Sequence, residues 1–214
     1  MSRPRLLVAT RSEHTLRELR ELLHLAYGEL VTLDDLGIPG DPEETGATFR
    51  TNAAIKARFG ARASGLPTLA DDSGLEVDAL DGGPGVRTRR FAGEHASDVE
   101  NNGLLLATLA DLPPELRGGR YVCVLALALP LPSRSRSGAS RAPGLTFTRG
   151  TCRGRIAAAP RGAGGFGYDP IFEPASEPPG GRTLGLWSPA EKGAISHRAR
   201  AVRRMAPRLA ERGF

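Results

Sequence analysis

The sequence predicts an α/β fold built on a mixed β-sheet, and three observations support this. Near the N-terminus, short apolar segments alternate with segments whose leucines and alanines recur at helical spacing. The middle of the chain is richer in strand-like segments. Among them, Tyr121–Leu129 is almost continuous in valine, leucine and alanine, which is typical of a central strand covered on both faces. Alternation followed by a strand-rich middle favours a mixed α/β sheet.

The first helix is expected between two short strands. Leu6–Ala9 has the pattern of an opening strand, and the leucines after it recur at helical spacing. Ser12 is the expected N-cap of this helix, because its hydroxyl can accept a hydrogen bond from the first turn. Gly28 is expected to end the helix, and Glu29–Leu33 to return as a strand.

A second helix is expected over residues 47–63, with Gly65 just beyond its end. Two short strands should follow, Thr68–Ala70 and Leu75–Leu80, with a pair of aspartates after the first of them. The segment 81–85 holds three glycines and a proline, so the chain must turn sharply there.

Capping boxes mark two further helices, at residues 97–100 and 188–191. Pro113-Pro114 is expected to stop the first of these, and the second has proline at its first helical position. The segment 146–156 supplies a strand partner for the central strand. An arginine-rich helix with an apolar stripe follows Ser196.

A chain of 214 residues can form one large domain or two lobes that share a sheet. Residues 130–143, rich in serine, arginine and proline, are interpreted as a flexible connection between two strands. The sequence contains no run of 18 apolar residues, so no membrane span is expected. The strand expected at Leu6 leaves no room for a signal peptide. We therefore expect a cytoplasmic protein with no membrane partner, in which Cys123 and Cys152 are buried or half-buried reduced thiols.

The net charge of +5 does not by itself indicate nucleic-acid binding. Nearly all the basic residues are arginines, with Lys56 and Lys192 the only lysines, and they are scattered apart from the 134–141 segment and the last helix. Such a distribution fits the binding of polyanionic small molecules as well as it fits DNA. No nucleic-acid partner is expected.

Two adjacent aspartates, Asp71 and Asp72, are expected at the end of an apolar strand. Consecutive strand residues point to opposite faces, so one carboxylate can face a cleft while the other accepts hydrogen bonds from the backbone. A carboxylate beside phosphates can hold Mg²⁺ or accept a proton from water. Ser73 and Gly74 then offer a hydroxyl and a close backbone approach. A plain aspartate pair in a turn is the alternative.

The segment Gly164–Pro170 interleaves glycines with two aromatic rings and an aspartate. Its glycines let backbone N–H groups approach a ligand, and Phe166 and Tyr168 are candidates for stacking on a base. The alternative is a glycine-rich hairpin with a core phenylalanine. Lys192 and Arg198 are candidate cations for phosphate or base oxygens, whereas solvated side chains are the alternative for such residues.

These motifs resemble, in order and over almost the whole chain, the noncanonical purine nucleoside triphosphate pyrophosphatases, which are the Ham1-like inosine/xanthosine triphosphatases. The matching segments are Thr10, 17–19, 44–49, 52–57, 70–75, 83–85, 164–172, 191–192 and 196–198. The resemblance implies a long twisted mixed sheet with helices on both sides, forming two lobes around a central nucleotide cleft. It also implies a homodimer that uses Mg²⁺ to hydrolyse ITP, dITP or XTP to the monophosphate and pyrophosphate.

The resemblance also implies residue roles. Asp72 matches the general base and metal-site aspartate, and we take Asp71 as a second metal candidate. The implied substrate-binding positions are Thr10, Arg11, Ser12, Thr15, Ser73, Phe166, Gly167, Tyr168, Asp169, Lys192, His197 and Arg198.

Two segments depart from the family pattern. The first loop has Ser12 and Thr15 where the family has asparagine and lysine, and Thr51 stands where we align a metal-binding glutamate. Loss of one charge-assisted contact costs about ten- to a hundredfold in affinity. Arg11 or His14 are candidates to replace the cation.

Glu43, Glu44 and Asp71 are candidates to replace the metal ligand. The functional prediction is therefore a hydrolase acting on noncanonical purine nucleotides. The alternative is a homologue that binds nucleotides with weak or lost hydrolysis.

Overall fold

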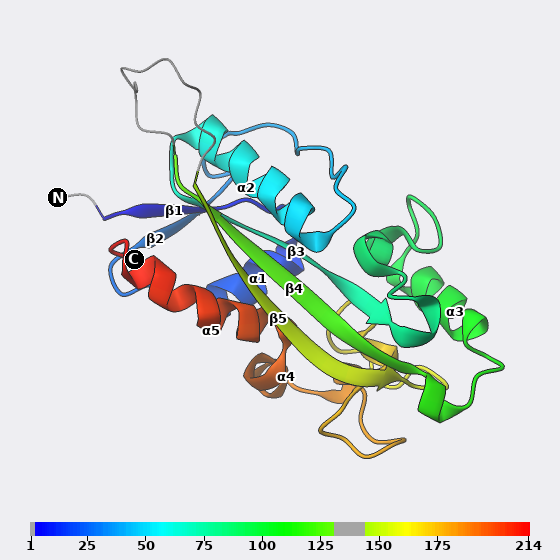
Figure 1. Ribbon diagram of the computed structural model, residues 1–214. Helices are drawn as coiled ribbons and strands as arrows, with labels where there is room; N and C mark the ends of the chain where they lie inside the picture. Colours follow the sequence, from blue (N-terminus) through cyan, green and yellow to red (C-terminus); the bar gives the residue numbers. More distant parts are fainter. Residues whose placement is uncertain (1–2, 131–143) are drawn as a thin grey trace. The chain divides into compact units, whose positions relative to one another are not determined.

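The computed structural model describes residues 3–130 and 144–214, and its strands form a six-stranded sheet in the order β2-β1-β3-β4-β5-β6 (Figure 1). The strands are β1 (Arg5–Val8), β2 (Glu29–Thr32), β3 (Thr68–Val77), β4 (Gly118–Ala128), β5 (Leu145–Ile156) and β6 (Phe172–Pro174). Strand β1 is parallel to both neighbours, whereas β5 and β6 are antiparallel. The sheet is therefore mixed, as predicted.

Five α-helices accompany these strands in the part of the chain that the structure describes: α1 (Glu13–Leu22), α2 (Phe49–Ser64), α3 (Asp98–Thr108), α4 (Pro189–Ile195) and α5 (His197–Ala210). Helices α1, α3 and α4 begin directly after the predicted caps Ser12, Ser97 and Ser188. Each of these serines accepts a hydrogen bond from the first turn of its helix. Gly65 ends α2 in the left-handed conformation, with φ of 69°. The flexible connection expected at 130–143 lies outside the described residues, apart from Pro130.

Two predicted helix ends are wrong. Helix α1 ends at Leu22, well before Gly28, because Leu23 turns into an extended conformation and buries its side chain. Helix α3 ends at Thr108 rather than at Pro113-Pro114. The buried guanidinium of Arg117 donates to the carbonyls of Ala110 and Leu112 and so satisfies the backbone beyond the helix.

The two strands predicted around the acidic motif are one continuous strand, β3. Asp71 and Asp72 therefore lie inside a strand instead of at its end, and both are buried. The extended chain stops at Val77, where a 3₁₀ turn at Asp78–Leu80 replaces the rest of the second predicted strand. The glycine-rich turn after it is as expected, with positive φ at Asp81, Gly82 and Gly85.

The chain divides into two compact units, and β3, β4 and β5 each contribute residues to both. Unit 1 comprises residues 1–72, 124–149 and 201–214. In β5 the guanidinium of Arg50 from α2 lies 3.9 Å from the ring centre of Phe147, whereas the Thr148 hydroxyl donates to the Ala201 carbonyl of α5. Because adjacent strand residues face opposite sides, α2 and α5 cover opposite faces of this part of the sheet.

Gly60 lets helix α2 approach the sheet closely. A Cβ at this position would lie 2.7 Å from Thr68 Cγ2, 3.0 Å from Leu7 Cδ2 and 3.2 Å from Ala9 Cβ. These distances leave no room for a side chain between α2 and strands β1 and β3. Lys56 lies one helical turn earlier, on the same face of α2.

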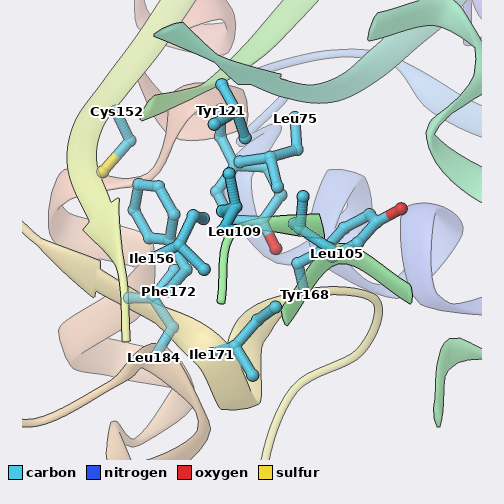
Figure 2. Packing of buried hydrophobic residues seen from close by; sticks show 11 residues of the cluster. Leu75, Leu105, Leu109, Tyr121, Cys152, Ile156, Tyr168, Ile171, Phe172 and Leu184 are labelled. Carbon is cyan, nitrogen blue, oxygen red and sulfur yellow. The ribbon is translucent and has the colours of Figure 1, made fainter. Parts of the chain in front are cut away.

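Unit 2 comprises residues 73–123 and 150–200, and its core is an apolar cluster of strand and loop residues (Figure 2). The cluster joins Leu75, Val77, Leu105, Leu109, Tyr121, Cys152, Ile156, Tyr168, Ile171, Phe172 and Leu184. Cys123 and Cys152 are buried free thiols, as predicted. Within residues 3–130 and 144–214, no helix is long and apolar enough to cross a membrane.

The close approach of α2 gives a stability prediction. Replacement of Gly60 by alanine adds about 1 kcal/mol of helix propensity but forces a methyl group against Thr68, so we expect a net loss of about 1–2 kcal/mol. The matched control is Gly103→Ala in α3, where a Cβ meets nothing within 4 Å. This variant should gain about 1 kcal/mol. Thermal unfolding of both variants tests the argument, and equal gains would contradict it.

Candidate functional site

Asp72 is a buried carboxyl at the centre of a charged group in unit 1. The Lys56 ammonium from α2 lies 3.0 Å from Asp72 Oδ1 and 3.5 Å from Glu44 Oε1. Residues 68 and 72 of β3 share one face of the strand, as do residues 56 and 60 of α2. The packing of Gly60 on Thr68 therefore aligns Lys56 with Asp72.

The second carboxylate oxygen of Asp72, Oδ2, is buried and has no hydrogen-bond partner. Burial raises the pKa of Asp72 to about 7, although the charge and hydrogen bond of Lys56 act in the opposite direction. For Lys56, burial acts to lower the pKa, but Asp72, Asp71 and Glu44 outweigh it and the net pKa is raised. Asp72 is therefore a carboxyl group that exchanges its proton near neutral pH, beside a lysine that stays charged.

The predicted first loop forms local structure in unit 1. Ser12 caps α1 by accepting from Thr15 N–H at 3.4 Å, and Thr15 is buried. The Thr10 hydroxyl accepts from Ser12 N–H at 3.2 Å. Arg11 pairs with Asp34 and with Asp41, and it donates to the carbonyls of residues 38 and 40. The structure thus directs Arg11 to the 34–41 segment.

Thr51 has a structural role at the start of α2. Its hydroxyl accepts from Thr48 N–H at 3.1 Å and donates to the Thr48 carbonyl at 2.8 Å, which completes a capping box. The carboxylate that reaches the Lys56 ammonium alongside Asp72 is that of Glu44. Among the alternatives named from the sequence, Glu44 thus pairs with the Lys56 ammonium, and the charge of Asp71 also acts on it.

Asp169 is the centre of a second buried charged group, in unit 2. Its Oδ2 accepts from the Lys192 ammonium at 2.6 Å and from the Phe166 N–H at 3.0 Å. Its Oδ1 accepts from the Tyr121 hydroxyl at 3.2 Å. The ammonium of Lys192 also lies 4.3 Å from the ring centre of Phe166. One carboxylate therefore holds the aromatic turn, the lysine and the tyrosine together.

The glycines of this turn are required by the same carboxylate. Gly165 has φ of 76°, and a Cβ there would lie 2.0 Å from Asp169 Oδ2. The peptide of Gly167 is fixed from α3: Asp98 accepts from its N–H at 2.6 Å, and Asn102 donates to its carbonyl at 3.0 Å. The 164–170 segment is thus an ordered turn, and side chains from α3 help to fix its conformation.

The two aromatic rings of this turn are placed differently. Tyr168 is buried in the core cluster, and its hydroxyl donates to the Thr88 carbonyl at 2.8 Å. Its ring is not available to stack on a base, which corrects that part of the sequence-based expectation. Phe166 is only partly buried and is the ring of the pair that remains accessible.

The predicted C-terminal residues of the site are buried in the same unit. His197 is 5 % exposed and stacks on Tyr121, with ring centres 4.8 Å apart and planes 10° apart. Burial, then the charges of Arg198 and Lys192, hold the pKa of His197 well below its usual range. The Arg198 guanidinium lies 3.4 Å from the Ser73 hydroxyl. His197 is therefore a neutral imidazole at physiological pH.

Several residues of these groups were missed as site residues in the sequence: Lys56, Asp98, Asn102 and Tyr121. One signal could have found Lys56. The chain has only two lysines among 29 basic residues, and each of them lies on a buried aspartate. The other residues carry no comparable local signal.

Comparison with known proteins connects these groups to a family. The sequence model of the Ham1 family matches residues 6–208. A dITP/XTP pyrophosphatase of Nocardia farcinica is 47 % identical over 98 % of this chain and 97 % of its own length. A Mycobacterium tuberculosis protein with the same description is 46 % identical over 96 % and 95 %.

Two solved structures are similar over nearly their whole length. A HAM1 protein from Coxiella burnetii has a TM-score of 0.83 and 38 % identity, covering 97 % of this chain and 99 % of the other. A nucleoside-triphosphatase, dITP/XTP pyrophosphatase, from Mycobacterium abscessus has a TM-score of 0.74 and 43 % identity, covering 95 % and 99 %.

The raised pKa of Asp72 gives a prediction about stability and pH in metal-free protein. Between about pH 4 and pH 7 the folded state keeps a proton on Asp72 that the unfolded chain has lost. The stabilising contribution is thus complete below about pH 4 and is lost by about pH 7. Relative to Asp72→Asn, the wild type should lose about 1 kcal/mol of unfolding free energy per pH unit in this window. Urea unfolding at several pH values in EDTA measures this, and a pH-independent difference would contradict it.

Proposed function

The chain belongs to the Ham1 family, and we propose that it hydrolyses noncanonical purine nucleoside triphosphates to the monophosphate and pyrophosphate. The substrates are dITP, ITP and XTP, and the activity removes deaminated purines from the nucleotide pool. Relatives described as dITP/XTP pyrophosphatases, matched over nearly the whole chain, support the reaction class. The observation that carries the proposal for this chain is Asp72, a buried carboxyl with a pKa of about 7 and an unpartnered oxygen.

Asp72 acts as the general base. A base is most effective when its pKa lies near the working pH, because it is then both ionised and basic enough to take a proton from water. Asp72 Oδ2 accepts the proton of the water that attacks the α-phosphorus, and pyrophosphate leaves. Lys56 stays charged at 3.0 Å from the other oxygen, so it keeps the carboxylate in place and adds positive charge near the phosphates.

Asp72 and Glu44 together fit a divalent cation, for which we propose Mg²⁺. The fit rests on the carboxylates of Asp72 and Glu44, which lie 3.0 and 3.5 Å from the same Lys56 ammonium. In the described parts of the chain, no three His, Cys, Asp or Glu side chains gather as a metal site. This suits Mg²⁺, which usually takes one or two carboxylates, with water and substrate phosphates completing its shell. When bound, Mg²⁺ neutralises polyphosphate charge.

The Asp169 group of unit 2 recognises the base. Phe166 offers a ring for stacking, and Arg198 and neutral His197 offer hydrogen-bond donors to a carbonyl oxygen. A 6-oxopurine presents an acceptor where adenine presents an amino donor, so donors at this position select inosine and xanthosine over adenosine. The Ser73 hydroxyl lies 3.4 Å from the Arg198 guanidinium in the same unit.

Further parts of the proposal follow from the family resemblance. We propose a cytoplasmic homodimer in which each chain acts as a single domain of two units. The competing function is nucleotide binding with weak hydrolysis. The burial of Thr15 in α1 and the capping role of Thr51 favour it, because neither side chain supplies the charge that the family pattern has there.

The test is pyrophosphate release from dITP, XTP, ITP, dATP and GTP, with Mg²⁺ and with EDTA. The wild type should favour dITP and XTP over dATP by at least about a hundredfold in kcat/KM. Asp72→Asn should lower kcat about 10²- to 10⁴-fold through loss of the base. Asp78→Asn is the matched control, since Asp78 forms an exposed ion pair with Arg153, and it should leave the rate unchanged.

Two results would contradict this proposal. Bound nucleotide without pyrophosphate release would establish the binding homologue. Equal rates for dITP and dATP would remove the assignment of the Asp169 group to base recognition.

A further inference from the structure

Tyr121 links the two sides of the Asp169 group. It lies on β4, is 7 % exposed and packs its ring against Phe172, with centres 4.8 Å apart and planes at 56° (Figure 2). Its other ring contact is the stack on His197, also at 4.8 Å. The same side chain therefore contacts the apolar core and a buried polar residue of the proposed base site.

The hydroxyl of Tyr121 donates to the second oxygen of the Asp169 carboxylate. Lys192 and the Phe166 N–H both use Asp169 Oδ2, whereas Tyr121 donates to Oδ1 at 3.2 Å. Burial, and then the charge of Asp169, raise the pKa of Tyr121 well above its usual value. The phenol stays protonated and remains a donor. With both oxygens engaged, the plane of the Asp169 carboxylate is fixed.

We propose that Tyr121 is a positioning residue for base recognition. Its hydroxyl fixes the Asp169 carboxylate, and through it the Phe166 turn, while its ring fixes the plane of the His197 imidazole. The inference rests on the proposed function and extends it to a residue that does not touch the substrate. In this role Tyr121 couples Phe166, the proposed stacking ring, to His197, a proposed hydrogen-bond donor to the base.

A core role alone does not account for this side chain. Phe172 is fully buried beside it, and a second phenylalanine would fill the apolar space without placing a hydroxyl in the interior. A buried hydroxyl costs free energy unless it is hydrogen-bonded. Here it is bonded to the one carboxylate that also orders Phe166 and Lys192. The ring and the hydroxyl thus contribute separately, and variants can separate them.

The experiment measures binding of IMP and of pyrophosphate by calorimetry. Tyr121→Phe keeps the ring and removes the hydrogen bond, and it should raise the Kd for IMP about three- to tenfold. Tyr121→Leu also removes the stack and should raise it further. Pyrophosphate carries no base, so its Kd should not change in either variant. In NMR spectra, the His197 ring signals should move in Tyr121→Leu and stay in place in Tyr121→Phe.

Thr148→Val is the matched control. It removes one hydrogen bond of a β-strand side chain, from the Thr148 hydroxyl to the Ala201 carbonyl at 2.9 Å, with no contact to the Asp169 group. It should leave both affinities unchanged. Unchanged IMP affinity in Tyr121→Phe would overturn the proposal, and so would a parallel loss of IMP and pyrophosphate binding, which would mark Tyr121 as a general core residue.

The readout also separates this inference from the proposed reaction. Binding of IMP does not require hydrolysis, so a wild type that binds IMP but releases no pyrophosphate from dITP would overturn the reaction and leave the role of Tyr121 standing. A wild type that binds neither IMP nor dITP would overturn both. If Tyr121→Leu fails to fold, the Tyr121→Phe variant with its Thr148→Val control decides the question.

Discussion

Both candidate groups depend on the same interaction, an ion pair between a lysine and a buried aspartate. Lys56 pairs with Asp72 at 3.0 Å, and Lys192 pairs with Asp169 at 2.6 Å. In the buried pair of Lys192 and Asp169, loss of one partner costs about 3–5 kcal/mol, because the remaining charge stays out of water. Each aspartate is therefore kept in its place by a specific lysine. In a chain whose other basic residues are arginines, both lysines are used in this way.

A lysine differs from an arginine in a manner that suits these positions. Its ammonium is a compact charge with three donors, whereas a guanidinium is a broad planar fork. The Lys192 ammonium contacts Asp169 and the face of the Phe166 ring at once. The Lys56 ammonium lies between two carboxylates. Arg11, by contrast, spreads its donors over a whole segment, 34–41, and orders it.

The two pairs leave their aspartates in different states. Both oxygens of Asp169 accept hydrogen bonds, with Lys192, the Phe166 N–H and Tyr121 among the donors, and the carboxylate holds the geometry of a turn. Asp72 has one oxygen on Lys56 and one without a partner, and burial brings its pKa to about 7. The hydrogen bonds to each carboxylate thus distinguish a group that holds a turn from one whose proton exchanges near neutral pH. The packing of Gly60 contributes to the state of Asp72, because it brings α2, and with it Lys56, close to β3.

Local signals in the sequence determined much of this protein. The capping boxes at 97–100 and 188–191 and the glycine turn at 81–85 form where expected, because their interactions join residues within a few positions of one another. The mixed sheet and the order of the motifs also followed from the sequence.

Only the tertiary structure decided the contacts that join distant residues. Lys56 and Asp72 are 16 residues apart, Asp169 and Lys192 are 23 apart, and Tyr121 and Asp169 are 48 apart. The tertiary structure also decided that β3 continues through two aspartates. The strand can bury Asp72 because helix α2 supplies a cation beside it. Burial and pairing are properties of the packed chain. The motifs identified the residues, and packing fixed their charge states and roles.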